Sequence, residues 1–263
     1  MLDISNLAPG RHELAGNVSS QFATGLIFAL PLLAGDSEIV FSSPLESRGY
    51  VDMTLGVVRA FGVRIDEKPC GFAIPGNQRF RAPRGGVHPE GDWSAAAFWF
   101  AANALGASIA VSNVGGNSRQ PDRAIRELAE RAASPEGATI DISQCPDLYP
   151  ALAAVAAATP GRTRFINAAR LRIKESDRIA AMEKVAAALG AGASSTAGEA
   201  VIEGAGAALA PCEIDSAGDH RIAMAAAIAS TRATGPVMIH RASCVAKSYP
   251  EFFETFASLA AHA

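Results

Sequence analysis

The pattern of apolar and polar positions alternates between two kinds of segment along the chain. Short runs rich in β-branched residues, which are typical of strands, are followed by longer alanine-rich runs in which apolar residues recur with helical period. This alternation predicts an α/β fold. In the first stretch we expect helices over residues 21–33 and 51–62 and strands at 37–43 and 63–68.

The same alternation recurs along the rest of the chain, which indicates internal repeats. Equivalent helices are spaced by about sixty residues, a period typical of repeated supersecondary units. A doubly wound sheet would show similar alternation, but no G-x-G-x-x-G segment opens any of the helices, which disfavours a dinucleotide-binding fold. The predicted elements are helices at 94–106, 121–132, 148–160, 175–191, 220–233 and 249–263, and strands at 108–114, 138–143, 163–168, 200–204 and 236–242.

One segment differs in composition from the alternating pattern. QRFRAPRGGVHPEGD, residues 78–92, is rich in glycine, proline and charge, as domain boundaries usually are. We therefore expect a first domain over residues 1–80, a hinge at 81–86 and a second domain over 87–263.

Composition and charge narrow the function classes. With 263 residues, 49% of them hydrophobic, the chain can bury a sizeable core, and a net charge of -3 gives no positive field for nucleic acid or an anionic membrane. No basic leader and no apolar run long enough to span a membrane is visible, so we expect a cytoplasmic protein. The four cysteines lack any C-x-x-C pairing, which favours reduced thiols over disulfides or a zinc site; we expect no cofactor and no metal.

Charged and hydroxyl residues gather just before several predicted helices, where backbone N–H groups favour anions. In NVSSQF, the side chains of Ser19, Ser20 and Gln21 fit either an ordinary helix cap or a phosphate site. In SQCPDLYPALA, Asp147 fits an N-cap or a functional carboxylate. Lys247, in SCVAKSYPEFF, fits a surface lysine or an isolated cation of a site.

Two further segments are denser in charge. RLRIKESDRIAAM places four cations (Arg170, Arg172, Lys174 and Arg178) and two carboxylates (Glu175 and Asp177) at the start of an amphipathic helix. It fits a salt-bridged helix entrance or a site that holds an anion beside an acid or base. GDHRIAMAAAIA sets Asp219, His220 and Arg221 before a helix that is apolar enough to be buried, so these charges need internal partners or a ligand. Together the segments predict chemistry on a substrate that carries phosphate or carboxylate groups.

At this level of detail the chain resembles the EPSP synthase (3-phosphoshikimate 1-carboxyvinyltransferase) family. KESDR and DHRIAM are the most specific of the matching segments, and all of them occur in the family's order. The segments are GNVSSQF, PLESRGYVDMTL, PEGDWSAAAF, GGNSRQPDRAI, CPDLYPALA, NAARLRIKESDR, GDHRIAMA and CVAKSYPEFF.

The resemblance implies a fold of repeated βαβαββ units, with residues 1–80 as the last unit of one lobe and 87–263 as a second lobe of three units. It also implies transfer of the enolpyruvyl group of phosphoenolpyruvate to shikimate 3-phosphate. By this resemblance, shikimate 3-phosphate is bound by Ser19, Ser20, Gln21, Ser47, Asp147 and Lys174, with Tyr50 beside them. Phosphoenolpyruvate is bound by Gln21, Arg178, Arg221 and Lys247, and the catalytic residues are Asp147, Glu175 and Lys247. Arg170 stands where some members have asparagine.

The family's N-terminal PGSKSxSNR segment and its later NAGT segment are absent from this sequence. We therefore expect an incomplete active site and exposed apolar surface on the first domain. Three hypotheses follow: a half that is active with an N-terminal half chain, a chain that self-associates to rebuild the cleft, or an inactive fragment that binds shikimate 3-phosphate. Among enzymes, a relative of the transferase that acts on UDP-N-acetylglucosamine is the alternative.

Overall fold

The computed structural model describes residues 7–206 and 208–260. Two compact units are present: unit 1 comprises Met1–Pro89 with Arg119–Pro121, and unit 2 comprises Glu90–Ser118 with Asp122–Ala263. Residues 1–6 of the expected first domain and 261–263 of the expected last helix lie outside the described residues. A hinge at 81–86 stays a prediction.

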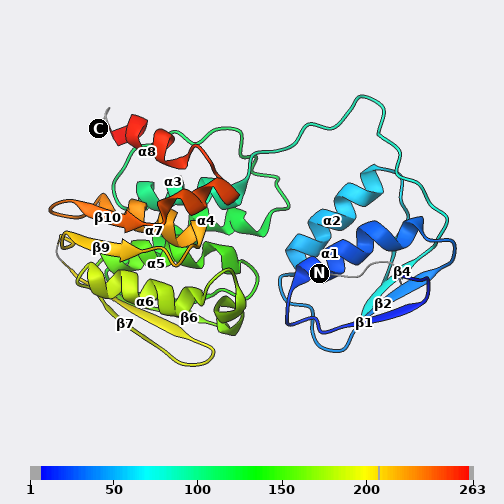
Figure 1. The fold of residues 1–263 in the computed structure, drawn as a ribbon, viewed down its shortest axis with the longest axis horizontal. Helices are drawn as coiled ribbons and strands as arrows, with labels where there is room; N and C mark the ends of the chain where they lie inside the picture. Colours follow the sequence, from blue (N-terminus) through cyan, green and yellow to red (C-terminus); the bar gives the residue numbers. More distant parts are fainter. Residues whose placement is uncertain (1–6, 207, 261–263) are drawn as a thin grey trace. The chain divides into compact units, whose positions relative to one another are not determined.

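Unit 1 is a four-stranded sheet with two helices on one face (Figure 1). The strand order is β1-β2-β4-β3, in which β1 and β2 are parallel and β4 is antiparallel to both of its neighbours. Buried apolar residues of both helices, among them Ile27 and Leu55, share one core with Ile39 and Phe72 of the sheet. The elements are β1 (Arg11–Leu14), α1 (Ser20–Ala29), η1 (Leu30–Leu32), β2 (Ser37–Phe41), α2 (Arg48–Ala60), β3 (Asp66–Lys68) and β4 (Gly71–Ile74).

Unit 2 holds two sheets and most of the helices. One sheet has four strands in the order β5-β6-β8-β7, and the other is the parallel pair of β9 and β10. Its elements are α3 (Trp93–Ala104), η2 (Pro121–Ala124), α4 (Ile125–Ala132), β5 (Ala138–Asp141), η3 (Pro146–Leu148), α5 (Tyr149–Ala158), β6 (Gly161–Ile166), η4 (Ala169–Ile173), α6 (Arg178–Ala188), β7 (Gly192–Ser195), β8 (Ala200–Gly204), β9 (Cys212–Asp215), α7 (His220–Ser230), β10 (Val237–His240), η5 (Ala242–Lys247) and α8 (Phe252–Ala260).

The two four-stranded sheets have the same topology, so a repeated unit is present, whereas the division of residues 87–263 into three units stays a prediction. In each, a strand, a helix and a parallel strand are followed by a second helix and two strands that pair antiparallel. The segment β9-α7-β10 repeats the first half of this βαβαββ unit. The predicted α/β fold is therefore confirmed.

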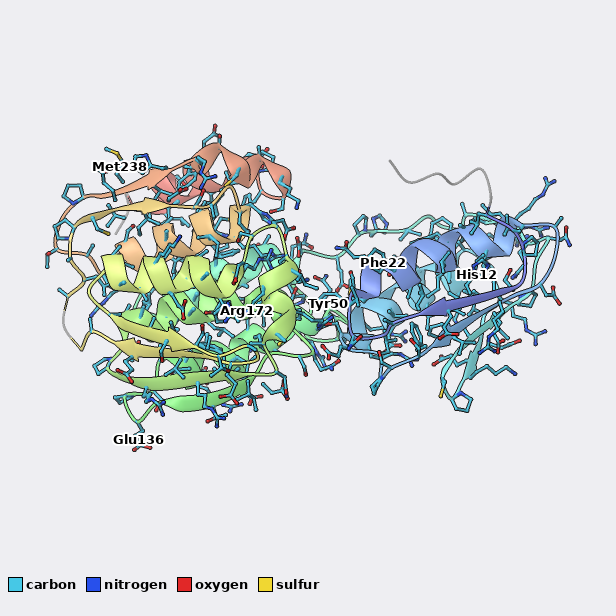
Figure 2. All side chains as sticks on the ribbon, turned by 60° about the horizontal axis from the view of Figure 1, so that its bottom comes forward. His12, Phe22, Tyr50, Glu136, Arg172 and Met238 are labelled. Carbon is cyan, nitrogen blue, oxygen red and sulfur yellow. The ribbon has the colours of Figure 1, made fainter. Side chains whose placement is uncertain are left out.

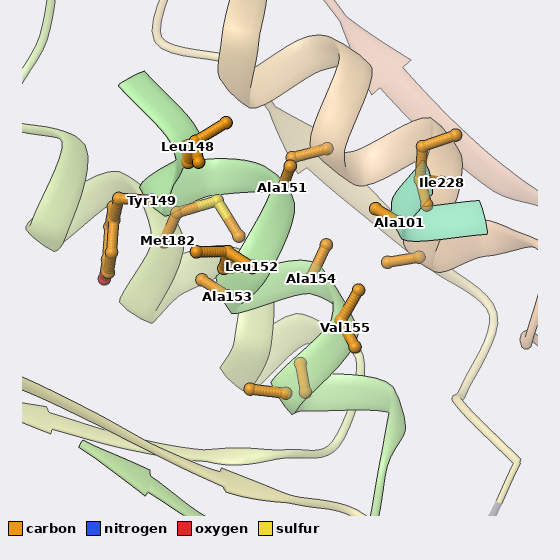
Figure 3. Packing of buried hydrophobic residues seen from close by; sticks show 14 of the residues in the cluster. Ala101, Leu148, Tyr149, Ala151, Leu152, Ala153, Ala154, Val155, Met182 and Ile228 are labelled. Carbon is orange, nitrogen blue, oxygen red and sulfur yellow. The ribbon is translucent and has the colours of Figure 1, made fainter. Parts of the chain in front are cut away.

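Helix α5 lies at the centre of unit 2 and explains its alanine-rich sequence. All ten residues of α5 are buried, and the helix packs against α7, α3, α4 and α6 and against β8 (Figure 3). Alanine allows these helices to approach closely, while Leu152, Met182 and Ile228 belong to the buried cluster around it. A helix that is apolar all round needs such cover on every side.

The prediction of a strand at residues 108–114 is wrong. These residues form no strand; instead the side-chain amide of Asn103 accepts from the Ile109 N–H (2.7 Å) and donates to the Ile109 carbonyl (2.9 Å). An amide side chain thus satisfies backbone groups that a strand would pair with a neighbour. Conversely, β1, β4, β7 and β9 were not predicted, because such short strands show too little apolar alternation to identify them.

Candidate functional site

All candidate residues follow strands of parallel pairs. In unit 2, Asp147 follows β5, Lys174, Glu175 and Arg178 follow β6, Arg221 follows β9, and Lys247 follows β10. Since parallel strands end at the same edge of their sheet, the loops of each pair open on one side. The fold therefore gathers these residues into one cluster, which we call the charged cluster: Asp147, Lys174, Glu175, Arg178, Asp219, Arg221 and Lys247.

Arg178 is the centre of the charged cluster. Its side chain is only 1% exposed, and its guanidinium donates to three carboxylates. Nη1 lies 2.7 Å from Asp147 Oδ1, Nη2 lies 2.7 Å from Glu175 Oε2, and Nε lies 2.9 Å from Asp219 Oδ2. A buried guanidinium needs such pairing, and its planar fork fixes the positions of its partners.

Asp147 receives cations from two segments. Besides Arg178, Lys174 Nζ lies 3.5 Å from its Oδ1, and Arg221 Nη2 donates to its Oδ2 over 3.3 Å. Burial alone would raise the pKa of Asp147, but the charges of Arg221, Lys174 and Arg178 outweigh it and hold the pKa well below its usual range. Asp147 is thus ionised at neutral pH. Because η3 precedes α5 and Leu148 is the N-cap position, the N-cap interpretation of Asp147 is wrong.

Glu175 lies between Arg178 and Lys247. Lys247 Nζ donates to Glu175 Oε1 over 2.5 Å, and Lys247 is 57% exposed. Partial burial would raise the pKa of Glu175, but the hydrogen bond from Lys247 and the charge of Arg178 lower it to about 2. Lys247 is therefore both a surface lysine and a member of the charged cluster.

The carboxylate of Asp219 is fully buried and caps α7. Its Oδ1 accepts from the Arg221 N–H (3.0 Å), and its Oδ2 accepts from Ser176 Oγ (3.1 Å) as well as from Arg178. The neighbouring His220 is also buried, and burial together with the charge of Arg221 lowers its pKa, so its imidazole is neutral at neutral pH. The sequence indicates this segment as a candidate site but assigns no role to Asp219. The side chains that Asp219 binds, Ser176 and Arg178, lie more than forty residues away in the sequence.

The remaining arginines of the 170–178 segment are directed elsewhere. Arg170 is buried and donates to the Ser143 carbonyl (2.8 Å). Arg172 donates to Asp177 Oδ2 (2.9 Å) and to Ser195 Oγ, while Asp177 Oδ1 caps α6 at the Ala180 N–H (3.0 Å). The segment is thus both a salt-bridged helix entrance and part of the charged cluster.

The candidate residues of unit 1 lie where α1 and α2 begin. Ser19 is the N-cap of α1 and accepts from the Gln21 N–H over 3.3 Å, Ser20 is buried in the first turn, and Gln21 is exposed. Ser47 is buried at the start of α2 with a left-handed backbone (φ 53°), and Tyr50 lies in the first turn of that helix.

The two loops that lead into these helices are joined to each other. Glu46 N–H donates to the Gly16 carbonyl (3.0 Å), and Asn17 N–H donates to Ser43 Oγ (3.2 Å). A side chain at Gly16 would bring a Cβ within 2.5 Å of the Ser43 carbonyl, so only glycine allows this approach. Ser19, Ser20, Gln21 and Ser47 therefore lie at one end of unit 1. The cap interpretation holds for Ser19, and a phosphate site at these residues stays a prediction.

No group of three or more His, Cys, Asp and Glu side chains lies where it could hold a metal ion, within residues 7–206 and 208–260. In the same residues, every helix is too short or too polar to cross a bilayer. The charged cluster instead offers four cations around three carboxylates, an arrangement that can hold an anion and move a proton.

Comparison with known proteins identifies the family. The model of the EPSP synthase (3-phosphoshikimate 1-carboxyvinyltransferase) family matches residues 1–256. A 3-phosphoshikimate 1-carboxyvinyltransferase of Clostridium kluyveri is 43% identical over 96% of this chain and 62% of its own length, and one of Clostridioides difficile is 40% identical over 96% and 61%.

Solved structures give the same result. An EPSP synthase of Acinetobacter baumannii superposes with a TM-score of 0.78 at 26% identity, over 96% of this chain and 62% of that structure. The enolpyruvyl transferase NikO of Streptomyces tendae shares the fold at 15% identity with a TM-score of 0.66. The chain spans about 61–62% of the length of the relatives named here from Clostridium kluyveri and Clostridioides difficile. It belongs to the EPSP synthase (3-phosphoshikimate 1-carboxyvinyltransferase) family.

Proposed function

We propose that the chain supplies one part of an active site that transfers the enolpyruvyl group of phosphoenolpyruvate to shikimate 3-phosphate. The observation that carries this proposal is the charged cluster, in which two partly exposed carboxylates lie between cations at the ends of parallel strands. Relatives that are 40–43% identical are named for this reaction, which favours it over transfer to UDP-N-acetylglucosamine.

In the proposed reaction, a hydroxyl of shikimate 3-phosphate attacks the enol carbon of phosphoenolpyruvate, and the methylene carbon of phosphoenolpyruvate takes up a proton. The tetrahedral intermediate then loses phosphate and a proton. Arg178, Arg221 and Lys247 would hold the carboxylate and phosphate of phosphoenolpyruvate, because cations are needed where the substrate carries charge. Asp147 and Glu175 would move the protons.

The ion pairs suggest how Glu175 gains a proton. While Lys247 donates to it, the pKa of Glu175 is too low for a general acid at neutral pH. Lys247 is the most exposed cation of the cluster and can turn toward an incoming phosphate. Loss of its hydrogen bond would raise the pKa of Glu175, so substrate binding would prepare the acid.

Shikimate 3-phosphate would be bound by Ser19, Ser20, Gln21 and Ser47 of unit 1 and by Asp147 and Lys174 of unit 2. The hydroxyls of Ser19 and Ser20 lie at the start of α1, where backbone N–H groups also favour a phosphate. Tyr50, in the first turn of α2, would lie beside this site.

The test is calorimetric titration of the chain with phosphoenolpyruvate, with inorganic phosphate as the reference ligand. We expect binding that Arg221→Ala weakens by about tenfold or more, because one charge-assisted contact is lost. Arg164→Ala, which removes an exposed pair with Glu199 outside the cluster, is the matched control and leaves the affinity unchanged. If the unmodified chain releases no heat, or if both variants bind equally well, the proposed site is wrong.

A second candidate function is binding of shikimate 3-phosphate without turnover, through the hydroxyls of Ser19 and Ser20 at the start of α1. Titration with shikimate 3-phosphate and a phosphate-release assay separate the two functions. Heat of binding without phosphate release, even when the N-terminal part of a relative is added as a separate chain, supports the binding fragment. Phosphate release on mixing supports the enzyme.

We also propose where the partner binds. Phe22, Phe28 and Leu32 are exposed on α1 and η1, so this apolar face would bind an N-terminal half chain or a second copy of this chain. No partner of nucleic acid or membrane type is proposed, and the proposed reaction would take place in the cytoplasm.

A further inference from the structure

We infer that Asp219 is a positioning residue, which fixes the guanidinium of Arg178 and the first turn of α7 with Arg221 in one geometry. This inference rests on the proposed function, in which Arg178 and Arg221 hold phosphoenolpyruvate. It concerns a residue that would not itself bind the substrate, because both oxygens of Asp219 already accept hydrogen bonds and a carboxylate repels the anionic groups of phosphoenolpyruvate.

The contacts of Asp219 connect two segments that are about forty residues apart. Oδ2 accepts from Ser176 Oγ (3.1 Å), in the loop after β6, and from Arg178 Nε (2.9 Å), at the first residue of α6. Oδ1 accepts from the backbone N–H of Arg221 (3.0 Å), which belongs to α7. One carboxylate therefore sets the distance between the two arginines.

The contact at Nε is the one that orients Arg178. Asp147 and Glu175 both bind the outer nitrogens, Nη1 and Nη2, which carry the remaining N–H groups of the guanidinium. Asp219 binds the inner nitrogen and so fixes the plane in which these donors lie. Without it the guanidinium can rotate about its long side chain, and its outer nitrogens lose their direction.

Within the described part of the chain, Arg178 is the one cation that forms an ion pair with Asp219 at hydrogen-bond distance. His220 Nδ1 lies 3.7 Å from Asp219 Oδ1, too far for a hydrogen bond, and has no hydrogen-bond partner among the described residues. Since burial lowers the pKa of His220, its ring carries no charge at neutral pH. A buried carboxylate requires a counter-ion, and here Arg178 provides it.

Asp177 shows what an N-cap aspartate does without a role in the cluster. Its Oδ1 also caps a helix, α6, and its Oδ2 also accepts from an arginine, Arg172. Arg172 makes its other contacts to Ser195 and Thr196, away from the charged cluster. The two aspartates thus share the same local motif, and only Asp219 binds an arginine of the cluster.

The experiment compares Asp219→Asn with Asp177→Asn. Asparagine keeps an oxygen that caps the helix, but its other atom is an NH₂ group that cannot accept from an arginine. We expect Asp219→Asn to weaken phosphoenolpyruvate binding by about tenfold or more, since misplaced binding groups are costly, whereas Asp177→Asn leaves it within about twofold. Asp219→Ser, which caps but is too short to reach Arg178, is expected to match Asp219→Asn and serves if the asparagine variant does not fold.

A second measurement follows Arg178 directly. The Arg178 Nε–H is buried and hydrogen-bonded, so it should give a slowly exchanging ¹H–¹⁵N signal, assigned by its loss in Arg178→Lys. We expect this signal to shift or disappear in Asp219→Asn and to stay in Asp177→Asn. A purely structural cap would change melting temperature alike in both variants and leave this signal in place.

The outcomes separate the inference from the proposed function. If the unmodified chain binds phosphoenolpyruvate and Asp219→Asn binds it equally well with an unchanged Arg178 signal, the inference is overturned and the function stands. If the unmodified chain does not bind phosphoenolpyruvate, the proposed function is wrong and, with it, the role of Asp219 in binding this substrate. In that case the Arg178 signal still decides whether Asp219 fixes this guanidinium.

Discussion

Arg178 couples the charges of the cluster because its three kinds of nitrogen each bind a different carboxylate. This coupling keeps both partly exposed carboxylates ionised: the pKa of Asp147 is held below its usual range by Arg221, Lys174 and Arg178 against the effect of burial. The pKa of Glu175 falls from 4.5 to about 2, although its partial burial acts in the opposite direction. Both residues therefore stabilise the fold in their charged form.

The pH dependence of stability follows from these shifts. Because the pKa of Glu175 is lower in the folded than in the unfolded chain, its contribution is complete above about pH 4.5 and is lost as the pH falls toward 2. We expect Glu175→Gln to lower the unfolding free energy by about 1–2 kcal/mol at pH 7 and to make no difference near pH 2. Urea unfolding at several pH values measures this difference.

Glu136→Gln is the control for this measurement, because Glu136 is an exposed carboxylate in the turn before β5. It should change the unfolding free energy little at any pH. A Glu175→Gln difference that stays constant between pH 7 and pH 2 would show that the ion pairs of Glu175 do not set its pKa.

Single residues show where sequence reasoning succeeds and where it stops. The cation-rich segment at the start of α6 indicates a site, because its six charged residues within nine positions are visible without the fold. The residue-level choice between cap and site is not visible: Asp147 resembles an N-cap in sequence, yet it meets Arg221, 74 residues away. Long-range partners of this kind follow from parallel strand pairing, which local pattern does not determine.

At the scale of elements, the two serines at the start of α1 have different roles. Ser19 Oγ accepts from the Gln21 N–H, whereas Ser20 is already inside the helix. We expect Ser19→Ala to lower the unfolding free energy of unit 1 by about 1 kcal/mol because the cap is lost. Ser20→Ala should be neutral or slightly stabilising, since alanine is the better helix former.

Denaturant unfolding monitored by circular dichroism compares the two serine variants. Equal losses in both would mean that the Ser19 hydroxyl does not cap α1. The same two variants also test the binding proposal. If these serines hold a phosphate, Ser20→Ala weakens binding of shikimate 3-phosphate without loss of stability.

The helices were predictable because each presents a long apolar pattern, and α5 is the clearest case with ten buried residues in sequence. The short strands were not, since β7 (GASS) has no strand-forming residue and β9 (CEID) has one. The expected strand at 108–114 has the right residues but is not a strand, because Asn103 satisfies the backbone of Ile109. Intrinsic propensity therefore describes which secondary structure a segment favours, and its tertiary contacts decide which one forms.

At the scale of the whole molecule, the same βαβαββ unit occurs in two different environments. In unit 2, α5 is covered by α3, α4, α6 and α7, and none of its residues is exposed. In unit 1 the equivalent helix α1, on which Phe22 is labelled in Figure 2, is nearly as apolar as α5. Yet Phe22 and Phe28 are 56% and 41% exposed, and Leu32, just beyond the helix, is 54% exposed. Residues 22–35 carry no charge, so this face suits another apolar helix layer.

This difference predicts that the isolated chain associates with itself through α1. Phe22, Phe28 and Leu32 recur at positions that share one side of the helix, with Gly25 between them, where an added Cβ would meet nothing within 4 Å. We expect light scattering to give a mass that rises with protein concentration, and Phe22→Ser with Phe28→Ser to reduce that rise. Met238→Ser, at an equally exposed residue of β10, is the control and should leave the association unchanged.

The same measurement distinguishes the possible occupants of this face. An N-terminal half chain that covers α1 should lower the self-association of this chain when it is added, because both occupants need the same apolar side chains. The serine variants should then lose binding of the half chain as well, while Met238→Ser keeps it. A chain that stays monomeric at all concentrations, or whose association the serine variants do not change, would show that α1 does not form the interface.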